Sequence, residues 1–228
     1  MSAGAPVVAI DGPSGAGKGT VSRLLASRLG WHLLDSGALY RLVALAGANA
    51  GLAPEDQAGH ARIARHLECQ FGTREDGSEL VLLDHQDVTA GVRSEASGAG
   101  ASRVAAWAEV REALLQRQRA YARPPGLVAD GRDMGTVVFP GARLKIFLVA
   151  SSEERAKRRY NQLKEKDSGV SLAALSREIA ARDRRDESRP ISPLVPAADA
   201  IVVDSTTLGV TEVVDYVWQL GRQRELWK

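Results

Sequence analysis

The sequence has a single cysteine, almost no net charge and no long apolar run. Cys69 has no partner for an internal disulfide, which favours a reducing compartment, and we interpret it as a small buried side chain and not a nucleophile. The net charge of +2 gives no indication of a nucleic-acid-binding or membrane-surface protein. No stretch is long enough to span a bilayer, residues 1–6 lack the basic segment of a secretory signal, and no exposed apolar stripe calls for a partner. We therefore expect a cytoplasmic monomer.

What the sequence does contain is a series of short apolar runs separated by helical patterns. This alternation predicts an α/β fold with a parallel sheet that is covered on both faces. The runs expected to form strands are residues 7–10, 31–34, 127–129, 144–149 and 200–203. Three of these runs lead directly into Asp11, Asp35 and Asp130. Because ligands bind beyond the carboxyl ends of such strands, we expect the three loops to meet at one site.

Residues from about 51 to 101 depart from that pattern. Apolar and polar residues alternate from Leu67 to Phe71, and an Asp-Gly turn signal at 76–77 precedes the apolar run 80–83. This predicts an antiparallel hairpin, which does not belong in a series of βαβ units, so we interpret it as part of an inserted small domain. The small residues 97–102 are interpreted as a flexible return to the main domain, followed by a helix over 103–121.

A phosphate-binding loop joins the first predicted strand to the helical run 21–29. It has the G-x-x-x-x-G-K pattern in the required setting of strand, loop and helix. Glycines let backbone N–H groups surround phosphates, and the helix N-terminus favours their negative charge. Lys18 is expected to reach the β- and γ-phosphates of ATP. The residues predicted to bind the nucleotide are Gly12, Pro13, Ser14, Gly15, Ala16, Gly17, Lys18, Gly19 and Thr20.

One departure from the usual loop concerns the metal ion. Gly19 stands where many P-loop proteins have Ser or Thr, and Thr20 follows it, which puts a direct hydroxyl contact with Mg²⁺ in doubt. We therefore expect Mg²⁺ to be held mainly by phosphates and water, and we assign no metal ligand in the chain. The same G-K-G-T order is typical of nucleoside monophosphate kinases.

Several arginines and acidic residues stand where they can bind anions. Arg41 and Arg132 each follow a strand-end loop, where a guanidinium can form two hydrogen bonds with one phosphate. In the predicted helix 171–189 an apolar face continues, at the same 3–4 spacing, into Arg182, Asp186 and Arg189 before Pro190. These charges either form a buried salt-bridge network or point into a ligand cleft.

A second helix is predicted to begin at the capping box of residues 151–154. Arg155, Arg158 and Arg159 then share one of its faces. Such a basic stripe is usually solvated, and the pattern alone gives it no further role.

Four segments together closely resemble bacterial cytidylate kinases, in order and over essentially the whole chain. They are residues 12–20, 35–41, 130–140 and 193–200. The resemblance implies a P-loop α/β fold of three layers with a five-stranded parallel sheet, and transfer of the γ-phosphoryl group of ATP to CMP or dCMP. It also implies core segments at 1–40, 103–152 and 171–228, an acceptor-binding region at 41–102 and a short lid at 153–170.

The resemblance also implies roles for individual residues. Arg182 and Asp186 correspond to residues that hold the acceptor's sugar, and Arg189 to one that holds its phosphate. Ser102, Arg111 and Asp133 correspond to the residues that bind the cytosine ring, and Arg155 and Arg158 to arginines of the lid. Ser36 is expected near the acceptor, together with Arg41. Lys18, Arg132, Arg189, Arg155 and Arg158 would neutralise charge during transfer.

Two other interpretations remain from the residues alone. One is a P-loop kinase for UMP or for a small metabolite such as shikimate. The other is a regulatory NTPase that signals through a partner, although the chain has no N-K-x-D guanine motif. An assay of ADP formation with a panel of acceptors separates these classes.

Overall fold

The structure is a computed structural model that describes residues 4–164 and 171–228. The chain divides into two compact units, one formed by residues 1–35 and 118–228 and the other by residues 36–117. We refer to them as the sheet unit and the insertion unit and describe each by itself. Among the described residues, no helix is both long and apolar enough to cross a membrane.

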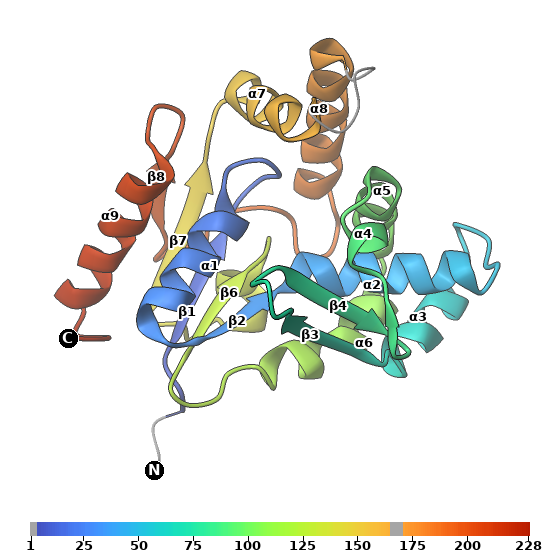
Figure 1. The fold of residues 1–228 in the computed structure, drawn as a ribbon, viewed down its shortest axis with the longest axis horizontal. Helices are drawn as coiled ribbons and strands as arrows, with labels where there is room; N and C mark the ends of the chain where they lie inside the picture. Colours follow the sequence, from blue (N-terminus) through green and yellow to red (C-terminus); the bar gives the residue numbers. More distant parts are fainter. Residues whose placement is uncertain (1–3, 165–170) are drawn as a thin grey trace. The chain divides into compact units, whose positions relative to one another are not determined.

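The sheet unit contains a five-stranded parallel sheet, as the sequence predicts (Figure 1). Its strands, in spatial order, are β2 (His32–Asp35), β6 (Leu127–Asp130), β1 (Val7–Asp11), β7 (Leu144–Val149) and β8 (Ile201–Asp204). Asp130 pairs in register with both Asp35 and Ile10. The strand ends that carry Asp11, Asp35 and Asp130 therefore lie side by side, as the sequence predicts.

One face of this sheet is covered by α1 (Lys18–Leu29) and α9 (Val210–Gln223), which lie together in Figure 1. Ile10 and Ile146 of the sheet form one apolar cluster with Leu25 of α1 and Val217 of α9, and all four are almost fully buried. Burying a side chain of this size stabilises the fold by about 1.5–3 kcal/mol. This packing makes the sheet and α1 a rigid base for the loops at the strand ends.

Two further helices of the sheet unit, α7 (Ser152–Leu163) and α8 (Leu172–Glu187), follow β7 in the chain. The short π-helix η1 (Met134–Val138) lies between β6 and β7. The α7 helix is capped by Ser151, whose hydroxyl accepts the N–H of Glu154 at 3.2 Å, as the predicted cap requires. The prediction that α8 reaches Arg189 is wrong by two residues, because Pro190 disfavours helical conformation in the residue before it. The predicted lid 153–170 extends into residues 165–170, which lie outside the described residues.

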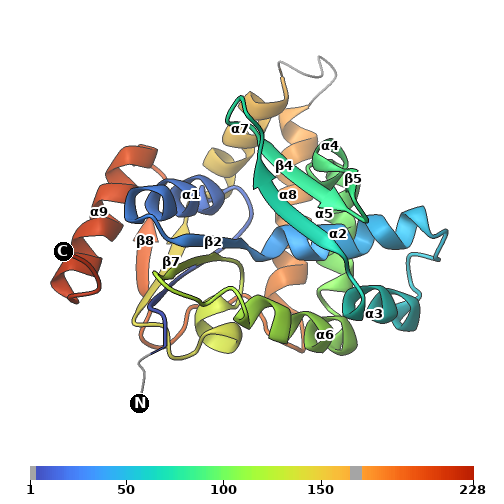
Figure 2. The same ribbon diagram turned by 60° about the horizontal axis from the view of Figure 1, so that its bottom comes forward.

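The insertion unit combines a small antiparallel sheet with helices. Its strands are β3 (Cys69–Thr73), β4 (Glu79–Leu83) and β5 (Gln86–Asp87), in the order β3-β4-β5 (Figure 2). Its helices are α2 (Ser36–Asn49), α3 (Gln57–Arg65), α4 (Thr89–Val92), α5 (Glu95–Val104) and α6 (Ala108–Arg119), the last of which ends two residues beyond the unit boundary. The predicted hairpin is confirmed as β3 and β4.

The interpretation of residues 97–102 as a flexible return is wrong, because they lie inside α5. Ser94 caps this helix by accepting the N–H of Ser97 at 3.2 Å. The small residues let α5 approach α2 closely, and a Cβ added at Gly100 would lie only 2.8 Å from the Cβ of Ala44. The single helix expected over 103–121 is likewise two helices, since α5 ends at Val104 and α6 begins at Ala108.

Candidate active site

The phosphate-binding loop has the backbone that its glycines predict. Gly12, Gly15 and Gly17 have φ angles of 144°, 79° and 95°, which side-chain-bearing residues rarely adopt. A Cβ at Gly12 would also lie 2.0 Å from the carbonyl oxygen of Leu148 on β7, so only glycine fits there. Gly17 then caps α1, and Lys18 is the first residue of that helix.

Lys18 is buried at the centre of a group of charges. Its Nζ donates a hydrogen bond to the carbonyl of Pro13 at 2.9 Å, which bends the side chain back over the loop. Burial, together with the positive charges of Arg132 and Arg182, lowers the pKa of Lys18 from its ordinary value of 10.5, while Asp130 opposes this change. An anionic polyphosphate over the loop would strengthen the charged form of Lys18, so the site is prepared for a ligand of negative charge.

Asp130 is a buried carboxylate whose position at a strand end is clear from the sequence, but whose role in the site is not. Its Oδ2 lies 3.3 Å from where a Cβ at Gly19 would stand, so the glycine after Lys18 leaves space beside a carboxylate. Burial raises the pKa of Asp130, and the neighbouring charge of Lys18 lowers it. The signal available in the sequence was the position of Asp130 at the end of a buried strand next to the phosphate loop.

The donor set at this point fits Mg²⁺, which prefers oxygen ligands and keeps several waters. Asp130 and Thr20 stand beside the phosphate loop, where they could contact the water shell of a phosphate-bound ion. Within residues 4–164 and 171–228, no three His, Cys, Asp or Glu side chains form a metal-binding group.

The charged end of α8 meets the loop that follows β6. The Nε of Arg132 donates to Oδ2 of Asp186 at 3.0 Å, and Nε of Arg189 donates to the carbonyl of Asp186 at 3.3 Å. Burial alone would raise the pKa of Asp186, but the positive charges of Arg132, Arg182 and Arg189 lower it below its usual value. The charges of Arg132, Arg182, Asp186 and Arg189 thus form one network, and Arg132 and Arg182 lie close enough to Lys18 to affect that lysine's pKa.

Asp133 lies next to this network, at the start of η1. It is 3% exposed, and its backbone carbonyl accepts the N–H groups of Val137 at 2.9 Å and Val138 at 3.2 Å. Asp133 thus belongs to the loop that carries Arg132, as expected from the adjacent positions in the sequence.

Two of the three arginines on the predicted basic stripe are not simply solvated. Arg155 is 5% exposed, forms a two-bond ion pair with Asp183 at 3.1 and 2.6 Å, and donates to the carbonyl of Ser14 at 3.0 Å. Arg158 donates to the carbonyls of Ala16 at 3.4 Å and Ser205 at 2.6 Å. Both guanidinium groups therefore contact the phosphate-binding loop through its carbonyl oxygens.

The other predicted acceptor residues lie in the insertion unit. Ser36, Ser102 and Arg111 are buried, and Arg111 donates to the carbonyl of Ala105 at 3.2 Å with its guanidinium 5.7 Å from the ring of Tyr40. Arg41 donates to the carbonyls of Val92 and Ser94, both at 3.0 Å, so it joins α2 to the segment before α5. Although Arg111 lies on a helix, it is only 8% exposed.

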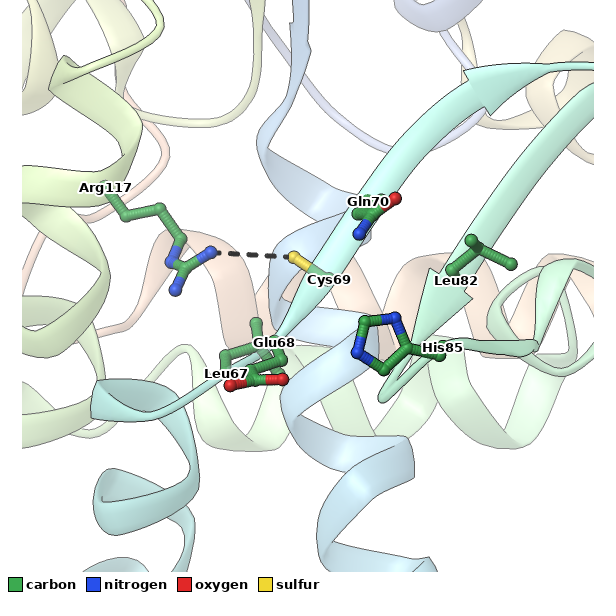
Figure 3. Close-up of a pocket in the computed structure, with 7 residues that line it drawn as sticks. All are labelled: Leu67, Glu68, Cys69, Gln70, Leu82, His85 and Arg117. Atoms are coloured by element: carbon green, nitrogen blue, oxygen red, sulfur yellow. Dashed lines mark hydrogen bonds between the residues drawn. The ribbon is translucent and has the colours of Figure 1, made fainter.

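Cys69 lies beside a pocket of about 280 Å³ in the insertion unit (Figure 3). The side chain of Arg117 points toward the Cys69 Sγ, which accepts a hydrogen bond from it at 3.8 Å. Burial nevertheless raises the pKa of the Cys69 thiol above its ordinary value, although Arg117 lowers it. A thiol with a raised pKa is a poor nucleophile at neutral pH. The expectation of a buried side chain is met only in part, because Cys69 is partly exposed.

Comparison with known proteins gives consistent matches. The sequence profile of the family described as cytidylate kinase matches residues 8–223. The chain is 58% identical to a cytidylate kinase from Pseudomonas fluorescens, with 93% of each chain covered, and 56% identical to one from Stutzerimonas stutzeri, with 97% of each covered. It is 55% identical to a cytidylate kinase from Pseudomonas putida over 99% of this chain and 100% of the relative.

Proposed function

Because the chain belongs to the cytidylate kinase family, it transfers the γ-phosphoryl group of ATP to CMP or dCMP, and we propose that the charged cluster around Lys18 carries this reaction. The observation on which the proposal rests is the arrangement of the sheet unit. A phosphate-binding loop and a network of three arginines with Asp186 are close enough for two of those arginines to act on the charge of Lys18. Such a site suits two anions that must be brought together.

The loop of residues 12–20 binds the phosphates of ATP, and Lys18 leaves the carbonyl of Pro13 to contact the β- and γ-phosphates. Bound Mg²⁺ would supply positive charge to the phosphate oxygens, and its contacts in the chain would be limited to Asp130 and Thr20, through water. Once ATP is bound, the backbone N–H groups of the loop and Lys18 all face the phosphates, so little reorganisation is needed when charge shifts during transfer.

The arginine network binds the acceptor. Arg132 and Arg189 contact the phosphate of CMP, while Arg182 and Asp186 contact its sugar. The Arg132–Asp186 pair at 3.0 Å supports this assignment, because it holds the guanidinium at the end of β6 until an anionic phosphate replaces part of its interaction. Since that phosphate is anionic at neutral pH, the reaction needs no general base, and the work of the residues is positioning and charge neutralisation.

Asp133 accepts the exocyclic amine of cytosine, with Ser102 and Arg111 as donors to the ring nitrogen and carbonyl. Ser36 and Arg41 both lie on α2, and they take part in binding the acceptor at the start of the acceptor-binding region of residues 41–102. The chemistry of the carboxylate supports a role for Asp133 in base recognition, because a carboxylate accepts a hydrogen bond from the amine of cytosine but not from the carbonyl that uracil presents in its place.

Arg155 and Arg158 act from the lid of residues 153–170. In the structure they contact carbonyls of the phosphate-binding loop, so a small movement of α7 would bring them from these carbonyls to the phosphates. Closure over bound substrates would also exclude water and so prevent hydrolysis of ATP. A cytoplasmic location and a monomeric state, both expected from the sequence, are part of this proposal.

The experiment that tests the proposal is an acceptor panel. The purified protein is incubated with ATP and Mg²⁺ and with CMP, dCMP, UMP, AMP, GMP or shikimate, and ADP and the phosphorylated acceptor are both quantified. The proposal predicts the largest kcat/KM for CMP or dCMP. Preference for UMP or for shikimate would favour the alternative kinases. A rate of ADP formation that no acceptor changes would favour a regulatory NTPase.

A further inference from the structure

Asp11, at the carboxyl end of β1, contacts the loop that carries Arg132 and Asp133. Its two carboxylate oxygens accept the backbone N–H groups of Met134 and Gly135, both at 2.8 Å. These are the first two residues of η1, which begins directly after Asp133. A π-helix of this kind is rare and is often found at functional sites. The first turn of η1 is therefore bound to the sheet by one charged side chain.

Burial of the Asp11 carboxylate is energetically unfavourable. It is 5% exposed, and burial raises its pKa to about 6, although the two backbone hydrogen bonds lower it. The charges that face it are Lys18 from α1, Asp130 from β6, Asp133 from the start of η1 and, through Gly135, Lys145 from β7. Neither donor binding nor phosphoryl transfer, as proposed above, uses this group.

A second charged side chain holds the other end of the same segment. Lys145 is buried on β7, where it pairs in register with Ala9, two residues before Asp11 on the neighbouring strand. Its Nζ donates to the carbonyl of Pro140 at 2.6 Å and to Asp199 at 2.9 Å. Gly135 lies against both anchors, since a Cβ there would be 3.1 Å from Cδ of Lys145 and 3.4 Å from Oδ2 of Asp11.

We infer that Asp11 is a positioning residue for acceptor specificity. By holding the N–H groups of Met134 and Gly135, it fixes the start of η1 and with it the carboxylate of Asp133 against the base of the acceptor nucleotide. Lys145 limits movement at the far end, so displacement of the segment after loss of Asp11 is concentrated at its first turn. The inference rests on the proposed function, because it takes Asp133 as the residue that recognises cytosine.

The test compares the variants Asp11→Asn and Asp133→Ala with the unchanged protein, using kcat/KM for CMP and for UMP. The asparagine keeps one acceptor oxygen but places an amide against the second N–H. We expect kcat/KM for CMP to fall roughly tenfold, the factor that corresponds to loss of one hydrogen bond to a charged group, with little change for UMP. Asp56→Asn is the matched control, because Asp56 also accepts a backbone N–H, from Gly59 at 2.8 Å, but belongs to the cap of α3.

The ratio of the two kcat/KM values also has an expected pH dependence. Taking the ratio cancels the titration of groups that both acceptors use equally, such as their phosphates and Lys18. In the unchanged protein the CMP-to-UMP ratio should fall as the pH decreases through about 6, where Asp11 becomes protonated and one of its oxygens turns from acceptor to hydroxyl. In Asp11→Asn the ratio should stay flat over the same range.

The outcomes separate this inference from the proposed function. A lower ratio in Asp11→Asn with an unchanged ratio in Asp56→Asn supports the positioning role. An unchanged ratio in Asp11→Asn, while Asp133→Ala lowers it, overturns the role of Asp11 and leaves the proposed function standing. An unchanged ratio in Asp133→Ala overturns base recognition by Asp133 and, with it, the inference. If Asp11→Asn does not fold, Gly135→Ala displaces the same turn with Asp11 in place, and an unchanged ratio there overturns the inference.

Discussion

Substitution of Asp186 by asparagine should weaken the folded protein and should make its stability more dependent on CMP. Asp186 is the carboxylate that compensates Arg132, Arg182 and Arg189 at the end of α8, and its side chain is 4% exposed. Removing one partner from a buried ion pair costs about 3–5 kcal/mol, because the remaining charges stay out of water. Arg132 keeps a side-chain exposure of 20%, which allows water to screen it, so we expect a value near the lower limit.

A loss of about 3 kcal/mol corresponds to a decrease in Tm of roughly 6–12 °C for a chain of this length. Because the pKa of Asp186 lies below its usual value of 3.8, its contribution is fully present at neutral pH and is lost only in acid, so the comparison belongs at pH 7. When the same fraction of each protein has CMP bound, CMP should raise the Tm of Asp186→Asn more than the Tm of the unchanged protein. The reason is that the phosphate of CMP supplies the negative charge that the arginines lose with Asp186.

Thermal unfolding with and without CMP measures both effects. Asp215→Asn is the matched control, because it removes an exposed partner, with Arg28 at 2.6 Å and both side chains more than two-fifths exposed. Such a pair contributes about 0–1 kcal/mol, so this variant should unfold close to the unchanged protein. If Asp186→Asn unfolded no lower than Asp215→Asn, the three arginines would not depend on Asp186 and the network would need another account.

Three further predictions concern other parts of the site. Asp133→Ala should lower kcat/KM for CMP roughly ten- to a hundredfold more than for UMP, and equal losses on the two acceptors in steady-state assays would assign Asp133 to the loop or the metal instead of the base. Arg155→Ala and Arg158→Ala should lower kcat more than they weaken CMP affinity, whereas calorimetry showing lost CMP binding beside an unchanged kcat would remove these arginines from the lid. Burial raises the pKa of Asp11 in the folded protein from 3.8 to about 6. The folded protein therefore becomes less stable as the pH rises between these two values, by roughly 3 kcal/mol in total. Denaturant unfolding should therefore show that the free energy of unfolding of Asp11→Asn increases relative to that of the unchanged protein from pH 4 to 7. A difference in free energy that stays constant over this range would contradict the raised pKa.

The sequence predicted the sheet unit well because its signals are local. Each strand is a short apolar run, and Asp11, Asp35 and Asp130 mark strand ends that a parallel sheet must bring to one edge. The phosphate-binding loop was equally clear, because positive φ angles and close approach to Leu148 require glycine at fixed positions. These features depend on residues near one another in the sequence.

The predictions that are wrong or missing concern features that depend on packing between segments far apart in the sequence. Glycine and alanine in residues 97–102 suggested flexibility, but they permit close packing of α5 on α2, which composition cannot reveal. The burial of Arg155 depends on Asp183, 28 residues later, and the role of Asp11 depends on N–H groups more than 120 residues away. No pattern along the chain indicates such pairings.

The central claim is that Lys18 and the loop around it direct the γ-phosphoryl group of ATP to CMP. It is tested most directly by supplying ATP labelled at the γ-position and measuring the label in CDP and in free phosphate, for the unchanged protein and for Lys18→Met. The account predicts that the unchanged protein places nearly all the label in CDP. Lys18→Met should lose transfer at least a hundredfold, as expected for a charge aimed at the transferring group, while keeping the same circular dichroism spectrum. Label released mainly as free phosphate, or near-normal CDP formation by a folded Lys18→Met, would contradict it.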